Sequence, residues 1–177
     1  YDIDFEHSTT VSINDYLMMI EKKTALLLAH SLRIGAYIAG ASTDEQEALY
    51  QYGRHIGIAF QIQDDVLDVY GDPSSFGKAI GGDICCNKKT FLLLTALDIA
   101  DAESKAELLQ WLITSNQNEE KIKAVTSIYT RLGVRQIGEA VMEDHTAEAL
   151  AQLELLPQNE YTNHLRELAE KLATRKR

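Results

Sequence analysis

Three aspartates on one face of a predicted helix are the residues in this sequence best suited to chemistry. Asp64, Asp65 and Asp68 follow Gln61 at the i, i+3, i+4, i+7 spacing that places side chains in one stripe along an α-helix. Carboxylates this close repel one another, and burial increases the penalty. A cation would offset it, and Mg²⁺ prefers carboxylate oxygens while keeping waters and bridging to phosphates. The spacing therefore predicts a magnesium site.

The alternative for the same aspartates is an ordinary solvated face, which is the usual role of charge runs in acidic proteins. The residues around the stripe argue against that alternative, because a solvated face rarely lies between large apolar side chains. These neighbours are Ile58, Phe60, Ile62, Val66, Leu67 and Val69. An EF-hand calcium loop is excluded, because its ligand spacing and its terminal glutamate are absent around Asp64.

The segment that follows the aspartates supplies positive charge. Lys78, Lys88 and Lys89 belong to a stretch that also contains four glycines between residues 71 and 82. Lysine ammonium groups bind phosphates as point charges. Glycines let a loop move and let the backbone approach a ligand closely. The pattern predicts a mobile lid that closes over a diphosphate, with a solvated surface loop as the alternative.

Helices are predicted for most of the chain, and they must position these groups. Ser12 and Asp15 form a capping box at the start of the first helix, Gly40 ends it, and Thr43 with Gln46 forms a second box. The predicted helices cover residues 12–39, 43–70, 89–112, 118–155 (interrupted near residue 133) and 161–173. Because no alternating strand pattern of useful length occurs, residues 1–177 are predicted to form one all-α helical bundle.

Composition narrows the classes of function. The formal net charge of −10 and the pI of about 4.9 argue against nucleic-acid binding, and an anionic substrate would need metal ions or local lysines. Cys85 and Cys86 are adjacent, which disfavours a disulfide and favours a reducing, cytoplasmic location. No apolar run approaches the ~20 residues of a transmembrane helix, and no signal peptide is recognisable. The five histidines lack a metal-ligand spacing and are interpreted as structural.

Several motifs resemble those of one enzyme family. Residues 60–68 (FQIQDDVLD) resemble the second Asp-rich motif of the trans-prenyl diphosphate synthases, which include farnesyl and geranylgeranyl diphosphate synthases. The family's further motifs are matched in order by Lys23-Thr24-Ala25, Gly71-Asp72-Pro73, Gly77-Lys78, Gly82-Asp83 and Asn87-Lys88-Lys89-Thr90, and residues 2–6 resemble the segment after its Gly-Gln pair. The resemblance covers the whole chain. It implies a helical bundle of the isoprenoid synthase type and a homodimer.

The resemblance also implies a metal-dependent prenyltransferase of isoprenoid biosynthesis. By its pattern Asp64 would ligate Mg²⁺ directly, with several ions expected around the bound diphosphate. Asp65, Asp68 and Asp83 would hold metal-bound waters or orient the neighbouring lysines. The expected substrates are an allylic diphosphate and isopentenyl diphosphate. Metal and lysines would stabilise the departing diphosphate, and the double bond of isopentenyl diphosphate would attack the allylic cation.

The remaining site residues come from the same resemblance. Lys23, Lys78 and Lys88 would bind the diphosphate of the allylic substrate. Thr24 and Gln61 would lie near the allylic carbon, where their oxygens would stabilise positive charge. Considered without the resemblance, a lysine such as Lys23 in the middle of a helix usually extends its ammonium to solvent.

The sequence departs from the family in one respect: it contains a single Asp-rich motif. Asp98 and Asp101 lack the paired aspartates of the family's first motif. We therefore interpret the chain as the C-terminal half of a synthase, without the N-terminal half that carries the first motif, and expect no synthase activity from it alone. Half a bundle should also expose an apolar face for the missing half or a partner chain to cover.

Two other functions stay open on these residues. A class I terpene cyclase shares the metal chemistry but normally lacks the Gly-Lys, Gly-Asp and Asn-Lys-Lys series found here. A non-catalytic helical subunit of a prenyl synthase is the second alternative, although intact aspartates and lysines argue against degeneration. The basic end Arg175-Lys176-Arg177 either folds over the diphosphate site or is a frayed helix terminus.

Overall fold

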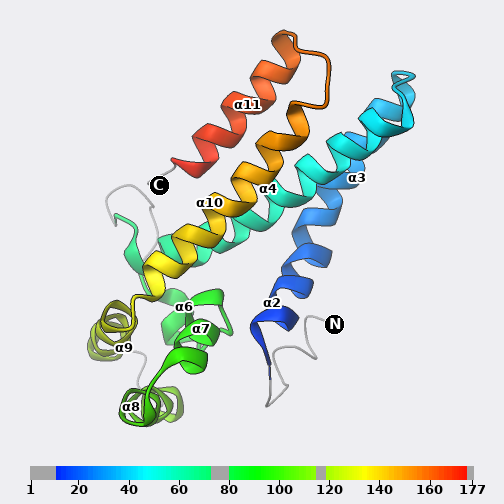
Figure 1. Cartoon of the computed structure of the whole chain (residues 1–177). Coiled ribbons are helices and arrows are strands. Elements are labelled where there is room, and N and C mark those ends of the chain that lie inside the picture. The colour runs from blue at the N-terminus through cyan, green and yellow to red at the C-terminus, as the bar shows by residue number, and fades with distance from the viewer. Residues whose placement is uncertain (1–10, 73–79, 115–118, 175–177) are drawn as a thin grey trace. The chain divides into compact units, whose positions relative to one another are not determined.

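The computed structural model describes residues 11–72, 80–114 and 119–174, which are almost entirely helical and contain no strand (Figure 1). The predicted all-α class is confirmed. The described chain divides into two compact units. The aspartate unit comprises residues 11–16 and 64–139, and the hairpin unit comprises residues 17–63 and 140–174. None of the helices in the described ranges combines the length and the apolar composition that crossing a bilayer would require.

The predicted first helix is present and contains a π-helical turn. It runs through α2 (Ile13–Ile20), η1 (Glu21–Ala25) and α3 (Leu26–Ile38) without a break. At its start the Ser12 amide donates to the Asp15 carboxylate (3.0 Å), and the Asp15 amide donates to the Ser12 hydroxyl (3.1 Å). The predicted capping box is therefore confirmed. The π turn η1 contains the Lys-Thr motif, and such turns often occur at functional sites.

Helix α4 (Thr43–Tyr70) carries the predicted aspartate stripe and ends where the sequence predicted. Its predicted N-terminal box is wrong by one residue. The cap is Ser42, whose hydroxyl accepts from the Glu45 amide (3.3 Å), while the Ser42 amide donates to the Glu45 carboxylate (2.7 Å). Both pairs satisfy the spacing rule, and Ser42 takes the role because it precedes the first helical residue while Thr43 is already inside the helix.

Two glycines let α4 pack unusually close to its neighbour in the hairpin unit. A Cβ added at Gly57 would lie 2.5 Å from the Ala25 Cα, and one added at Gly53 would lie 2.9 Å from the Ala29 Cα. Each pair is spaced i, i+4 on its own helix, so the four small residues form one contact face. This face brings η1 and the start of α3 against α4 at backbone distance.

The hairpin unit is completed by α10 (Val134–Leu153), from residue 140 onward, and by α11 (Glu160–Ala173), which run antiparallel (Figure 1). Asn159 caps α11 by accepting from the Thr162 amide (3.1 Å). The core of this unit consists of Ala48, Tyr52, Ile56, Ala149, Leu153, Leu156 and Ala169. Outside this core α3 carries exposed apolar residues, among them Leu27, Ile34 and Ile38. These side chains form no part of the core of the hairpin unit.

The aspartate unit contains α6 (Gly82–Cys85), α7 (Phe91–Ile99), α8 (Ala102–Ile113) and α9 (Glu119–Arg131). The single helix predicted over residues 89–112 is wrong, because Ala100 is extended and Asp101 caps a new helix by accepting from the Ser104 amide (2.7 Å). The interruption predicted near residue 133 is confirmed, since Gly133 has a φ of 70° between α9 and α10. All side chains from Phe91 to Ala96 are buried, so α7 is the core of this unit.

A pair of histidines links α4 and α10 within the hairpin unit. The Nδ1 atoms of His55 and His145 lie 2.9 Å apart, so the two rings can share one proton. Burial lowers the pKa of both imidazoles, and the charge of Arg54 lowers both further. The carboxylates of Glu21 and Glu148 raise the pKa of both imidazoles, which opposes these effects. Asp144 also raises the pKa of His145.

We expect the His55→Gln variant to show a weaker dependence of folding stability on pH. Because the folded-state pKa of each imidazole is below its unfolded value, the unfolded chain binds more protons in mild acid. The stabilisation is therefore complete above the unfolded pKa and is lost as the pH falls through the folded pKa. The drop in the free energy of unfolding between about pH 7 and pH 5 should shrink in the variant. Urea unfolding at both pH values measures this, with exposed His164→Gln as control. Equal slopes in the wild type and His55→Gln would contradict it.

Candidate functional site

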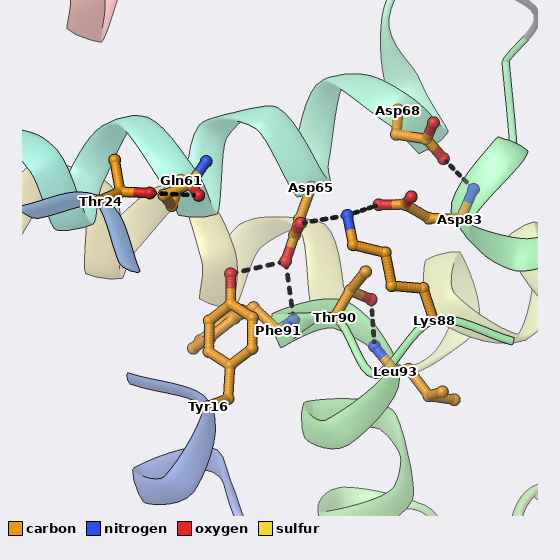
Figure 2. Close-up of polar contacts among 10 residues, drawn as sticks. All are labelled: Tyr16, Thr24, Gln61, Asp65, Asp68, Asp83, Lys88, Thr90, Phe91 and Leu93. Carbon is orange, nitrogen blue, oxygen red and sulfur yellow. Dashed lines mark hydrogen bonds and ion pairs between the residues drawn. The ribbon is translucent and has the colours of Figure 1, made fainter. Parts of the chain in front are cut away.

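Asp65 is the buried member of the aspartate stripe, with 5% of its surface exposed. Its Oδ2 accepts from the Tyr16 hydroxyl (2.7 Å) and from the Phe91 amide (2.9 Å), as Figure 2 shows. Phe91 is the first residue of α7, whose N-terminal amides lack intrahelical acceptors and favour a negative charge. Thr90 caps the same helix by accepting from the Leu93 amide (3.2 Å). Asp65 is thus fixed by a neighbouring hydroxyl and a helix terminus.

Lys88 connects Asp65 to the other acidic groups (Figure 2). Its Nζ lies 2.9 Å from Asp83 Oδ2 and 3.8 Å from Asp65 Oδ1, and about half of the side chain is exposed. The Asp83 amide in turn donates to Asp68 Oδ2 (3.0 Å). The structure therefore brings together four of the predicted site residues from α4, α6 and the segment before α7. Here one ammonium faces a group of carboxylates and retains access to solvent.

The ionisation of this cluster follows from burial and charge. Burial raises the pKa of Asp65 to about 6, against two opposing hydrogen bonds. Burial also raises the pKa of Asp68. For Lys88, burial opposes the charged form, but the hydrogen bond to Asp83 and the nearby carboxylates outweigh it and raise the pKa of Lys88. The cluster thus carries more negative than positive groups in a partly buried place, where added cations are favoured.

The Lys-Thr motif lies in the hairpin unit. The Thr24 hydroxyl donates to Gln61 Oε1 at 2.9 Å, which brings together the two residues expected near the allylic carbon (Figure 2). Gln61 lies one helical turn before Asp65 on α4. The ammonium-bearing Lys23 precedes Thr24 in η1 and is exposed.

The structure describes some of the remaining predicted residues and leaves others outside the described ranges. Asp64 is partly exposed on α4. Lys78 lies outside the described residues, as do residues 2–6 and the basic end of the chain. Asp98 is exposed, and Asp101 is the N-cap of α8.

The donor set fits a metal shared with a ligand better than one enclosed by protein. Within residues 11–72, 80–114 and 119–174, no three His, Cys, Asp or Glu side chains converge as a metal cluster. Asp65 is directed to Tyr16, Phe91 and Lys88, whereas Asp64 and Asp68 are partly exposed. Magnesium commonly uses one or two carboxylates, retained waters and substrate phosphates, and two partly exposed aspartates meet that need.

Sequence reasoning missed the groups that hold Asp65. Tyr16 is 2% exposed and packs its ring 6.1 Å from that of Phe91, so it is a core residue with its hydroxyl turned to the site. Burial, followed by the Asp65 charge, raises the pKa of Tyr16 well above its usual range, so the hydroxyl keeps its proton and remains a donor. The signal available in the sequence was a tyrosine just inside a helix start, which alone predicts only packing.

Comparison with known proteins shows the family of the chain. The family model described as "Polyprenyl synthetase" matches residues 1–129. A short chain isoprenyl diphosphate synthase from Methanothermobacter thermautotrophicus is 37% identical over 169 residues, which are 96% of this chain and 51% of that protein. The chain thus spans about half the length of the curated relatives it matches.

Solved structures show the same similarity. A geranylgeranyl pyrophosphate synthase from Corynebacterium glutamicum, complexed with isoprenyl diphosphate and magnesium, matches with a TM-score of 0.88 and 32% identity over 99% of this chain and 50% of that one. A polyprenyl synthase from Caulobacter crescentus, complexed with calcium and isoprenyl diphosphate, matches with a TM-score of 0.89 and 29% identity. The match covers 99% of this chain and 54% of that protein's chain. The helical bundle is therefore of the isoprenoid synthase type, and the chain belongs to the polyprenyl synthetase family.

Proposed function

We propose that this chain forms the part of a prenyltransferase that binds and ionises an allylic diphosphate, which the complete enzyme condenses with isopentenyl diphosphate. The observation that carries the proposal is the cluster in which Lys88 lies 2.9 Å from Asp83 and 3.8 Å from Asp65. A half-exposed ammonium held between carboxylates suits a ligand that brings both phosphate oxygens and metal ions. Family membership supports the same reading, because the matched enzymes are named as isoprenyl diphosphate synthases.

The proposed roles follow from the contacts of each residue. Lys88 binds the leaving diphosphate, and Asp65 with Asp83 holds the ammonium in place. Asp64 and Asp68 hold Mg²⁺ or its waters, which suits their partial exposure. Bound magnesium supplies charge neutralisation for the departing diphosphate.

The residues of the Lys-Thr motif complete the proposed set. Lys23 and Lys78 add positive charge for the diphosphate. The Thr24 hydroxyl donates to Gln61 Oε1 at 2.9 Å, and this hydrogen bond orients both oxygens. The lone pairs of the two oxygens can then stabilise positive charge at the allylic carbon.

The wider assembly is part of the same proposal. Residues 1–177 would be the C-terminal part of one synthase domain, and the N-terminal half would supply the first Asp-rich motif and the isopentenyl diphosphate site. That half would cover the apolar face of α3 at Leu27, Ile34 and Ile38, which are 74%, 57% and 78% exposed. We further propose a homodimer, as the family resemblance implies, and a cytoplasmic location, which suits the free thiols of Cys85 and Cys86.

Binding of inorganic diphosphate tests the proposal directly on this chain. The carboxylates repel diphosphate until a cation is present, so Mg²⁺ should raise the affinity of the chain for diphosphate. Diphosphate should then raise the affinity of the chain for Mg²⁺ by the same factor. Asp68→Asn should reduce this coupling, whereas Asp98→Asn on the exposed end of α7 should not. Isothermal titration of each ligand with and without the other measures the factor. Independent binding of the two ligands in the wild type would remove the basis of the proposal.

When the chain is incubated with Mg²⁺, isopentenyl diphosphate and an allylic diphosphate, we expect it to form no chain-elongated prenyl diphosphate. The reason is that the residues proposed here hold only one of the two substrates. Product analysis by mass spectrometry, with a complete family member as positive control, checks the expectation. Any chain-elongated product formed by this chain alone would show that it contains a full site.

A further inference from the structure

Lys121 is buried, although lysine is among the side chains that proteins bury least. It is 1% exposed and is the third residue of α9 (Glu119–Arg131). The first turn of a helix favours anions and disfavours a cation. Loss of hydration and the helix dipole therefore both oppose a lysine at this position. By contrast, Lys123 on the same helix is exposed and pairs with Glu119 at 3.3 Å.

The Lys121 ammonium reaches the turn that precedes α7. Its Nζ donates to Asn87 Oδ1 at 2.7 Å. The Asn87 side-chain amide donates in turn to the Leu112 carbonyl at 2.9 Å. Leu112 lies in the last turn of α8 (Ala102–Ile113), where carbonyls lack an intrahelical donor. The side chain of Asn87 is thereby tied to two helices at once.

Asn87 also has an uncommon backbone conformation. Among the described residues it is the one non-glycine residue with positive φ, at 53°. Such a conformation has to be held by its surroundings, even though asparagine tolerates it better than most residues. The next residue is Lys88, whose amide donates to the Asp83 carbonyl at 2.9 Å and whose Nζ lies 2.9 Å from the Asp83 carboxylate. The turn at Asn87 therefore sets the direction in which Lys88 leaves the backbone.

A small cavity lies beside Lys121. Its volume is about 10 Å³, and Asp83, Asn87, Lys88 and Lys121 are among the residues that line it. This space holds no more than about one water molecule. The Lys121 side chain is also 1% exposed, and its hydrogen bond to Asn87 connects its ammonium to the turn that precedes Lys88.

We propose that Lys121 is a positioning residue for diphosphate binding. Through Asn87 it holds the left-handed turn that directs Lys88 toward the carboxylates and the ligand. This inference rests on the proposed function only in assigning the diphosphate to Lys88. The geometric part concerns the turn itself and can be tested without any ligand.

Lys121→Met tests the proposal, with the exposed Lys123→Met as the matched control. Amide hydrogen exchange at Lys88 is expected to become roughly tenfold faster in Lys121→Met, and the affinity for magnesium with inorganic diphosphate roughly tenfold weaker. Exchange at the α7 amides after Phe91 should stay close to that of the wild type. In a Lys88→Met background, Lys121→Met should cause no further loss of affinity, because the lysine through which it acts is absent.

Asn87→Gly is the second variant and keeps the test decisive if Lys121→Met does not fold. Glycine adopts a φ of 53° without strain, so the backbone is permitted while the side-chain link is lost. Unchanged exchange at Lys88 in whichever variant folds would overturn the proposal. So would uniformly faster exchange through α7, or a loss of affinity that persists in the Lys88→Met background, since both indicate a general structural role. Faster exchange at Lys88 with no diphosphate binding in the wild type would support the positioning and reject the proposed function.

Discussion

Lys88→Met is expected to weaken binding of inorganic diphosphate in the presence of Mg²⁺ by about 10- to 100-fold, the range for a lost hydrogen bond between charged groups. Lys88 is the one cation whose ammonium the structure describes within 4 Å of both Asp65 and Asp83. Methionine keeps much of the side-chain length and removes the charge. Without the ammonium, the neighbouring carboxylates would repel the ligand more strongly. Titration calorimetry at constant Mg²⁺ concentration measures the change.

The control for this experiment is Lys105→Met, which removes an exposed lysine from α8. It changes the net charge by the same amount and leaves the cluster intact, so a long-range charge effect would appear equally in both variants. Lys88→Arg should recover only part of the affinity, because the guanidinium is larger and planar and cannot repeat the contacts to Asp83 and Asp65. An affinity of Lys88→Met equal to that of Lys105→Met would exclude Lys88 from the site.

Gly57→Ala is expected to destabilise the hairpin unit by about 1 to 3 kcal/mol, as overpacking of a tight contact does. The new methyl would lie 2.5 Å from the Ala25 Cα and 2.8 Å from its Cβ, and backbone cannot rotate out of the way. The two helices would have to separate. Because Gln61 lies one turn after Gly57 on α4, its bond to Thr24 should be lost as well. Urea unfolding monitored by circular dichroism gives the free energy of unfolding.

Gly35→Ala in α3 provides the opposite case for this prediction. A Cβ added at Gly35 meets nothing within 4 Å, and the residue lies inside a helix. Alanine there should stabilise by about 0.5 to 1 kcal/mol, because it restricts the unfolded chain. If Gly57→Ala behaved like Gly35→Ala, the close approach of the two helices would be wrong.

Capping motifs and the spacing of apolar residues predicted most of the helices. They failed where two capping motifs overlapped or where a helix break had no glycine or proline to mark it. Ser42 and Thr43 both match a capping box, and only the position of the first helical residue decides between them. The break at Ala100 was missed because residues 89–112 are continuously compatible with a helix. Its cause is Asp101, whose side chain satisfies the Ser104 amide and starts a new helix.

For the site, spacing placed the aspartates on one face and predicted a magnesium site, and the family resemblance left Asp65 either to hold a metal-bound water or to orient a lysine. The structure adds partners that the sequence did not predict, since Asp65 accepts from groups 49 and 26 residues away in the sequence. Such partners cannot be inferred from periodicity, because periodicity depends on backbone hydrogen bonds that span only four residues. The roles of Asp64 and Lys23 remain predictions, as does that of Asp68, which the Asp68→Asn titration tests.

The sequence by itself determined that this protein is helical, that α4 presents an acidic stripe and that lysines follow it. These properties arise from residue types at fixed local intervals, which the α-helix converts into a face regardless of what lies beyond it. Only the tertiary structure decided that Tyr16 and the N-terminus of α7 hold Asp65, and that Lys121 is buried against Asn87. Those pairings depend on which distant segments pack together, and burial then makes each unsatisfied polar group costly enough to fix a specific partner.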